Sequence, residues 1–201
     1  GGCDKIGASS YAYRIGRDVV LVDIGIDPDT NSLPSFELLP PDWIADLRCI
    51  VLTHLHADHA AGLLRFESSF NRLDKLYIPR DLPIYCTATT AQLFYDVLRM
   101  SAGEESWRIS DPTGTINALS DRLHPIRTDT WHRLDNYALK LIDYPHVPGS
   151  ALLEIESPEG RLLHAVDYAV SRSLGGETID LSWLENEEIK VVVLESTYGQ
   201  I

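Results

Sequence analysis

The chain has 201 residues, of which 44% are hydrophobic, and this is enough to bury the core of one globular domain. Its 17 basic and 30 acidic residues give a net charge of -13, which argues against a broad phosphate-binding surface made by this chain alone. The longest apolar runs, such as residues 19–26, contain a charged residue and are too short to cross a bilayer, so no transmembrane span is predicted.

Two strands joined by a tight turn are predicted near the start of the chain. Residues 9–16 and 18–25 are rich in β-branched and aromatic side chains, and Gly16 marks the turn between them. A short buried strand is predicted at residues 49–54, and residues 60–69 have the spacing of a helix. The first third of the chain therefore places three strands before a helix.

The middle of the chain is predicted to hold a brief strand, a helix and a loop. Residues 75–79 have the composition of a strand. Between Thr87 and Met100, apolar residues recur on one helical face, which predicts an amphipathic helix. Residues 100–115 are polar and contain glycine and proline, so we expect a loop there.

The last part of the chain is predicted to be a series of strands. Strands are expected at residues 137–144, 151–157 and 161–166, the last two joined by a turn at 158–160. A final apolar run at residues 190–195 predicts a buried strand. Because strands and helices alternate and no repeat or linker divides the chain, we predict one layered α/β domain with sheets inside and helices outside.

Residues 51–62 gather three histidines and an aspartate directly after a predicted strand. His54 and His56 stand at alternate positions, so their side chains fall on the same side. Asp58 and His59 lie in the turn that starts the next helix and can face a neighbouring point, which allows a site for two ions. Neutral imidazole and carboxylate are ligands that suit zinc and, less strictly, iron or manganese. A metal site is favoured over a polar surface loop.

The segment Thr53–His59 resembles the H-x-H-x-D-H signature of the metallo-β-lactamase superfamily. Further motifs follow in the order of that family: Asp23 matches the first motif, His146 the third and Asp167 the fourth. The resemblance implies a four-layer αββα sandwich with a dinuclear metal site at one edge.

The end of the chain adds a second resemblance. Residues 191–199 are similar to the motif that opens the β-CASP insertion in nucleic-acid-processing members of the superfamily, with Glu195 as its acidic residue. Within that branch, the sequence is most similar to RNA-cleaving proteins related to the cleavage and polyadenylation specificity factor nuclease. Pro145 and Val166 depart from the pattern, because relatives commonly have glycine at both positions.

The resemblance also implies a role for each motif residue. Six side chains are the expected metal ligands: His54, His56 and His146 for one ion, Asp58 and His59 for the second, and Asp167 as the bridge between them. Asp58 would also accept a proton from the attacking water, Asp23 would orient and support the site, and Glu195 would orient a metal-binding histidine.

The resemblance implies that residues 1–201 form one metallo-β-lactamase-like domain, which ends where a β-CASP insertion would begin. It implies a later metal ligand and a proton donor, so we expect a following segment or a partner chain to complete the second metal position. The expected function is cleavage of RNA phosphodiester bonds at a dinuclear zinc site. Two alternatives stay open: hydrolysis of small esters, thioesters or lactones, which the acidic charge favours, and a non-catalytic scaffold subunit.

The remaining titratable residues receive structural interpretations. His124 and His132 lie in a polar, arginine-bearing region and are predicted to be surface residues. His164 is interpreted as a sheet histidine satisfied by hydrogen bonds rather than as a ligand. The cysteines, at positions 3, 49 and 86, form no Cys-x-x-Cys pair and are predicted to be inert thiols in a reducing cytoplasm.

Overall fold

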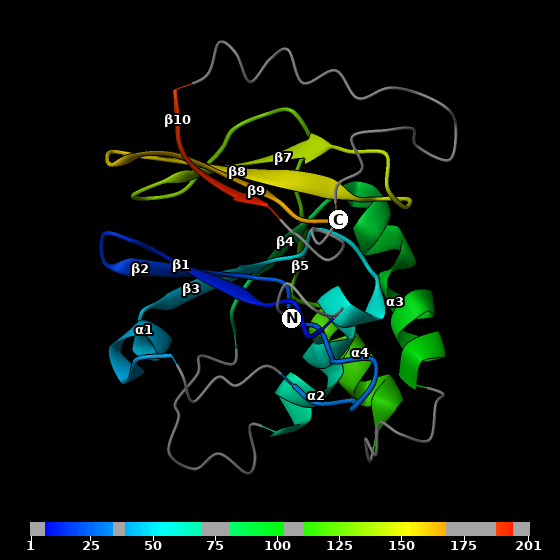
Figure 1. Ribbon diagram of the computed structural model, residues 1–201. Helices are drawn as coiled ribbons and strands as arrows, with labels where there is room; N and C mark the ends of the chain where they lie inside the picture. The colour runs from blue at the N-terminus through cyan, green and yellow to red at the C-terminus, as the bar shows by residue number, and fades with distance from the viewer. Residues whose placement is uncertain (1–6, 34–38, 70–80, 103–110, 168–187, 195–201) are drawn as a thin grey trace, which may run out of the picture.

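Two β-sheets that face each other form the frame of the protein (Figure 1). The computed structural model describes five parts of the chain: residues 7–33, 39–69, 81–102, 111–167 and 188–194. The first sheet holds five strands in the order β1-β2-β3-β4-β5. Their bounds are Tyr11–Ile15, Asp18–Val22, Leu47–Val51, Ile84–Cys86 and Leu123–Pro125. β1 and β2 form an antiparallel hairpin, whereas β2 to β5 run parallel.

The second sheet also has five strands, in the order β10-β9-β8-β7-β6. In chain order, the bounds of β6 to β10 are His132–Arg133, Ala138–Asp143, Ala151–Ser157, Gly160–Ala165 and Ile189–Leu194. The pairs from β6 to β9 are antiparallel, and β10 joins β9 in parallel. β10 is therefore an edge strand.

The helices of the described residues lie on the outer side of the first sheet (Figure 1). They are α1 (Pro41–Ala45), the short π-helix η2 (Ala57–Ala61), α2 (Gly62–Ser69), α3 (Ala88–Ala102) and α4 (Pro112–Ser120). No helix within these parts of the chain is long and apolar enough to span a membrane.

Side chains that alternate along β2 enter two different hydrophobic cores. Val19 and Leu21 pack with the helices in one core, together with Phe94 of α3. Val20 and Val22 point the other way, into a core between the sheets. The resulting order of helices, sheet and sheet agrees with the predicted α/β fold and with an αββα sandwich.

Several predicted elements are present in the structure. Gly16 turns the first hairpin with a φ of 59°, a conformation that glycine adopts readily. The strand predicted before the histidine cluster is β3, and the amphipathic helix predicted from Thr87 is α3. The predicted strand at residues 75–79 lies outside the described residues.

The loop predicted at residues 100–115 is wrong at both ends. α3 continues to Ala102, and α4 begins at Pro112. The side chain of Asp111 accepts a hydrogen bond from the Gly114 backbone nitrogen and so caps this helix. Proline at the first helical position costs no hydrogen bond. The Asp-Pro pair is therefore a helix start rather than part of a loop.

The prediction of a buried final strand is also wrong in part. β10 overlaps the predicted range and begins one residue before it, but three of its apolar side chains are about half exposed: Val191 (48%), Val192 (51%) and Leu194 (52%). The apolar run gave the correct element because β-branched residues favour strands. It did not reveal that the strand lies at the edge of the sheet.

Candidate metal centre

The histidine cluster follows the carboxyl end of β3, inside the first sheet. His54 and His56 come three and five residues after the end of this strand, and Asp58 and His59 occupy the first turn of η2. His54 Nε2 lies 3.1 Å from His56 Nδ1, so the two imidazoles converge as the alternation predicts. His54 and His59 are buried, whereas His56 is partly open to solvent.

The second sheet brings two further side chains to the same place. His146 follows β7, and Asp167 follows β9 by two residues. His146 Nε2 lies 3.3 Å from His56 Nδ1. The Ala151 backbone nitrogen at the start of β8 donates to the Thr53 carbonyl at 2.9 Å, which joins the two sheets beside the cluster. The centre is therefore assembled from both sheets.

Asp167 stands at the middle of the cluster. Its Oδ2 atom lies 3.2 Å from His54 Nε2, 3.3 Å from His59 Nε2, 3.5 Å from His146 Nε2 and 3.8 Å from His56 Nδ1. Asp58 Oδ2 lies 3.8 Å from His59 Nε2 on the far side. One carboxylate oxygen thus faces the ring nitrogens of four histidines.

The donor atoms form two groups, each compact enough for one metal ion. One group contains His54, His56, His146 and Asp167, and the other contains Asp58, His59 and Asp167. Within each group the ligand atoms lie within 4.8 Å of one another. Asp167 belongs to both, which is the arrangement that a bridging ligand between two ions requires.

Asp23 supports this arrangement from behind. It is fully buried, and its Oδ2 atom lies 2.8 Å from His59 Nδ1. The Thr53 backbone nitrogen and hydroxyl donate to the same carboxylate at 2.8 and 2.6 Å. A metal-binding histidine typically donates its second ring nitrogen to a carboxylate in this way. Asp23 therefore orients His59 and leaves its Nε2 facing the centre.

Two aspartates of the site adopt a backbone conformation that is unusual outside glycine. Asp23 has a φ of 57° and Asp167 a φ of 53°. Each follows the end of a strand, and a left-handed residue there turns the chain sharply. Aspartate tolerates this region better than most residues, and such conformations concentrate at functional sites.

The turn that carries Asp58 and His59 is packed against the segment after β2. The Ile24 backbone nitrogen donates to the His59 carbonyl at 2.7 Å, and the Ser9 nitrogen donates to the Asp58 carbonyl at 2.8 Å. A methyl group at Gly25 would overlap that same Asp58 carbonyl. This close approach explains why residue 25 has no side chain.

The loop that carries His146 is held by the start of α3. The hydroxyls of Thr87 and Thr90 both donate to the Gly149 carbonyl, at 3.0 and 2.9 Å. Gly149 has a φ of 88°, and a side chain there would collide with Thr90. The threonines were not predicted as site residues, because both fall within the predicted amphipathic helix, where threonine carries no distinctive signal.

Electrostatics couple the clustered groups. Burial disfavours the charged form of His59, but contacts with Asp167 and Asp23 outweigh it and raise its pKa to about 10. Burial lowers the pKa of His54. Burial also opposes ionisation of Asp167, yet contacts with the four histidines hold its pKa far below the usual range. The flanking carboxylates therefore favour the protonated form of His59, whereas burial favours the neutral form of His54.

These residues fit a pair of divalent cations. His59 Nε2 is buried and makes no hydrogen bond within the described residues, although Asp167 Oδ2 is 3.3 Å away. Imidazole and carboxylate donors suit zinc, manganese and iron. A bound cation would accept the lone pairs of the converging histidine nitrogens, which hydrogen bonds satisfy only in part.

The other singled-out residues are placed as follows. Glu195 lies outside the described residues, so its role stays a prediction. His164 is fully buried and its Nδ1 is hydrogen-bonded to Tyr13, but its Nε2 makes no hydrogen bond within the described residues, so the expectation of a satisfied histidine is met at one ring nitrogen only. His124 is exposed, whereas His132 is only partly so and its ring lies 5.0 Å from that of Tyr85. Two of the three cysteines, Cys49 and Cys86, are buried free thiols.

Comparison with known proteins agrees with this geometry. Residues 4–72 match the family described as the metallo-beta-lactamase superfamily, a span that includes Asp23 and the histidine cluster. The predicted resemblance to the metallo-β-lactamase superfamily is confirmed over this span. A solved structure of this superfamily's fold, the protein YhfI from Bacillus subtilis, aligns with 92% of this chain and 62% of its own, at a TM-score of 0.57 and 15% identity. This likeness shows the shared metallo-β-lactamase fold.

Curated relatives within the superfamily cover nearly the whole chain. The RNase J-like protein of Methanocaldococcus jannaschii is 28% identical over 99% of this chain and 42% of its own length. Endoribonuclease YSH1 of Eremothecium gossypii is 22% identical over 99% of this chain and 26% of its own. The predicted resemblance to RNA-processing members is confirmed. The chain spans less than half the length of these relatives.

Proposed function

We propose that this metallo-β-lactamase domain hydrolyses RNA phosphodiester bonds at a dinuclear zinc centre. The observation that carries the proposal is the pair of ligand groups that share Asp167. Relatives named as an RNase J-like protein and an endoribonuclease support RNA as the substrate. Zinc is the metal we favour, because histidine and carboxylate ligands without thiolate are typical of catalytic zinc sites.

The ligand set assigns a task to each residue. His54, His56 and His146 would hold one ion, Asp58 and His59 the second, and Asp167 both. Two ions held there would lower the pKa of a shared water and clamp the attacking and leaving oxygens of the phosphodiester.

The protein's own groups would then handle the proton. Asp58 is partly exposed, with its Oδ2 atom 3.8 Å from His59 Nε2, so its carboxylate would hold the second ion and still be open to solvent. We assign it as the acceptor of the proton that the attacking water loses. Asp23 never contacts substrate in this scheme, because it acts by holding His59. Glu195 stays a predicted partner of a metal-binding histidine.

The extent of the domain is part of the proposal. We propose that residues 1–201 form the metallo-β-lactamase-like portion of a β-CASP-type enzyme, and that a following segment or partner chain completes the second ion's ligands and donates the proton to the leaving group. The coverage of 42% and 26% of the relatives' lengths supports this division. A reducing cytoplasm is the proposed compartment, in keeping with the buried free thiols of Cys49 and Cys86.

The net charge of -13 favours one alternative, hydrolysis of small esters, thioesters or lactones. An acidic chain repels RNA unless bound cations or another segment attract it. A non-catalytic scaffold is less well supported, because all six predicted ligands gather in the two groups.

Substrate panels separate the candidates. The zinc-loaded protein, in a form that includes the segment or partner chain proposed to complete the site, is incubated with single-stranded RNA and with thioester substrates, in parallel with Asp58→Asn and with the exposed-surface control Asp121→Asn. We expect RNA cleavage that Asp58→Asn reduces at least a hundredfold and the control leaves unchanged. Cleavage of thioesters alone would reject the RNA proposal in favour of the alternative.

A further inference from the structure

The metal-centre residues reach the site from two separate sheets. His54, His56, Asp58 and His59 follow β3 of the first sheet, whereas Asp167 follows β9 of the second. The distance between the facing sheets therefore sets the distance from Asp167 to the histidines. Because ligand geometry must hold to within a fraction of an ångström, this spacing needs a fixed contact near the site.

One partly buried hydrogen bond crosses between the sheets beside the end of β9. The Tyr13 hydroxyl, from β1 of the first sheet, lies 2.7 Å from His164 Nδ1 on β9. His164 is fully buried and stands three residues before Asp167. The Tyr11 ring packs edge-on against the same imidazole, with ring centroids 4.7 Å apart. These contacts fix the ring of His164 in one orientation.

Both partners of this bond are neutral near pH 7. Burial raises the pKa of Tyr13 above its ordinary value and lowers the pKa of His164 to about 4. The charge of Asp23 makes a smaller contribution that raises the pKa of both groups. His164 Nε2 is buried without a hydrogen-bond partner in the described parts of the chain, so Tyr13 supplies the one polar contact found there for this ring.

We propose that Tyr13 and His164 are positioning residues of the metal centre, whose hydrogen bond fixes the end of β9, and with it Asp167, against the sheet that carries the histidine cluster. The proposal rests on the metal centre described under the proposed function. The Tyr13–His164 hydrogen bond differs from an ordinary core hydrogen bond in one respect. Loss of an ordinary core bond lowers stability alone, whereas loss of this bond also moves Asp167 relative to the other ligands.

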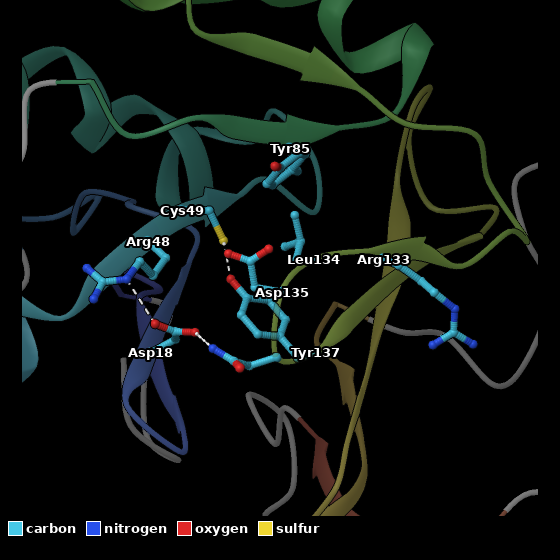
Figure 2. A pocket seen from close by; sticks show the side chains of 9 residues that line it. Asp18, Arg48, Cys49, Tyr85, Arg133, Leu134, Asp135 and Tyr137 are labelled. Carbon is cyan, nitrogen blue, oxygen red and sulfur yellow. Dashed lines mark hydrogen bonds and ion pairs between the residues drawn. The ribbon is translucent and has the colours of Figure 1, made fainter.

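A second tyrosine hydroxyl that joins the two sheets provides a matched control for loss of the Tyr13–His164 bond. The Tyr137 hydroxyl lies 3.4 Å from Cys49 Sγ, and this contact also joins the two sheets in the buried core. This contact lies at a pocket of about 420 Å³. Figure 2 shows Tyr137 and Cys49 with two further lining residues, Asp18 and Arg48, which stand near the amino ends of β2 and β3. Tyr137 directly precedes β7, whereas His146 follows the other end of that strand.

The test compares Tyr13→Phe with Tyr137→Phe, since each removes one hydroxyl from the core between the sheets. The metal-free chain and both variants are titrated with Co²⁺ while the visible absorption of the bound ion is followed. We expect Tyr13→Phe to weaken Co²⁺ binding about tenfold or more and to alter the absorption bands, as mutation of outer partners of metal ligands does. Tyr137→Phe should bind as the wild type does, even where both variants melt at the same lowered temperature.

The outcomes separate this inference from the proposed function. A wild-type chain that binds no Co²⁺ contradicts the proposed metal centre itself. A wild-type chain that binds Co²⁺, with Tyr13→Phe giving the same affinity and spectrum, overturns the positioning role.

A second pair of variants tests the proposal in case the Tyr13→Phe chain does not fold. His164→Asn places an amide oxygen near the former Nδ1 and keeps an acceptor for Tyr13, whereas His164→Leu keeps none. We expect the Asn variant to hold Co²⁺ within about threefold of the wild type and the Leu variant to lose at least tenfold. Equal Co²⁺ affinity of the two variants would overturn the proposal.

Discussion

Asp23 and His59 are joined by a 2.8 Å contact between Oδ2 and Nδ1, and both side chains are almost completely buried. Asp23 belongs to neither ligand group. The Asp23 carboxylate holds Nδ1 of the imidazole, so the other ring nitrogen, Nε2, faces the centre. A hydrogen bond thus joins the first motif to the histidine motif, behind the predicted ligand His59.

Asp23→Asn tests this coupling. The amide is weaker than a carboxylate as an acceptor for His59, so we expect the affinity for Zn²⁺ to fall about 10- to 100-fold. Competition with a chromophoric chelator measures the affinity. Asp18→Asn is the control, because Asp18 is also buried but lies at the opposite end of β2, paired with Arg48. Equal effects of the two changes would show that any buried aspartate of this strand matters alike.

Gly25→Ala tests the packing of the turn that presents Asp58. The added methyl overlaps the Asp58 carbonyl, so η2 must shift, and we expect a loss of about 1–3 kcal/mol in stability together with weaker Zn²⁺ binding. Thermal unfolding and chelator competition measure the two effects. Gly16→Ala serves as the control: its φ of 59° costs stability through backbone strain, but nothing lies within 4 Å of the new methyl. Unaltered metal binding by both variants would contradict the packing argument.

Thr90→Val tests the support of the His146 loop. Valine keeps the shape of threonine but removes the hydroxyl that donates to the Gly149 carbonyl at 2.9 Å. We expect a loss of about 1 kcal/mol in stability and a several-fold loss of Zn²⁺ affinity, because His146 becomes less well placed. Thr115→Val, which removes a hydroxyl bonded to the Asp111 carbonyl in α4, should leave metal affinity unchanged. Thr90→Val binding zinc as tightly as the wild type would count against the loop's role.

Four of the six predicted ligands could be identified from the sequence because they lie close together in the chain. His54, His56, Asp58 and His59 occupy six residues after an apolar strand, and extended backbone beyond that strand is expected to turn His54 and His56 to the same side. The prediction that His146 and Asp167 join these residues came from the order of the family's motifs rather than from their spacing. Whether these residues bind metal stays a prediction.

Other features depend on tertiary contacts that local sequence does not encode. β4 has three residues, too few to show a period, and it is a strand because Ile84 and Tyr85 pair with β3. Tyr13 has the alternation of any strand residue, and nothing in the sequence links it to His164, 151 residues later. The exposed side chains of β10 likewise reflect its place at the sheet edge rather than its composition.

The buried imidazole of His164 predicts a specific pH dependence of stability. Its pKa is lowered from 6.5 to about 4 in the folded chain, mainly by burial. Between these pH values the unfolded chain binds a proton that the folded chain does not. Stability therefore falls as the pH drops from 6.5 towards 4, by about 3 kcal/mol in total, and His164 makes no such contribution above pH 6.5.

His164→Asn isolates this contribution, because asparagine does not titrate and the other histidines remain in both proteins. Urea unfolding of the metal-free chains at pH 7.5, 6, 5 and 4.5 gives the free energy of each. We expect the wild type to lose more stability than the variant as the pH falls, so that the difference between them changes by about 2–3 kcal/mol across this range. A difference that stays constant with pH would mean that His164 takes up its proton in the folded chain as readily as in the unfolded one, and that burial does not keep it neutral.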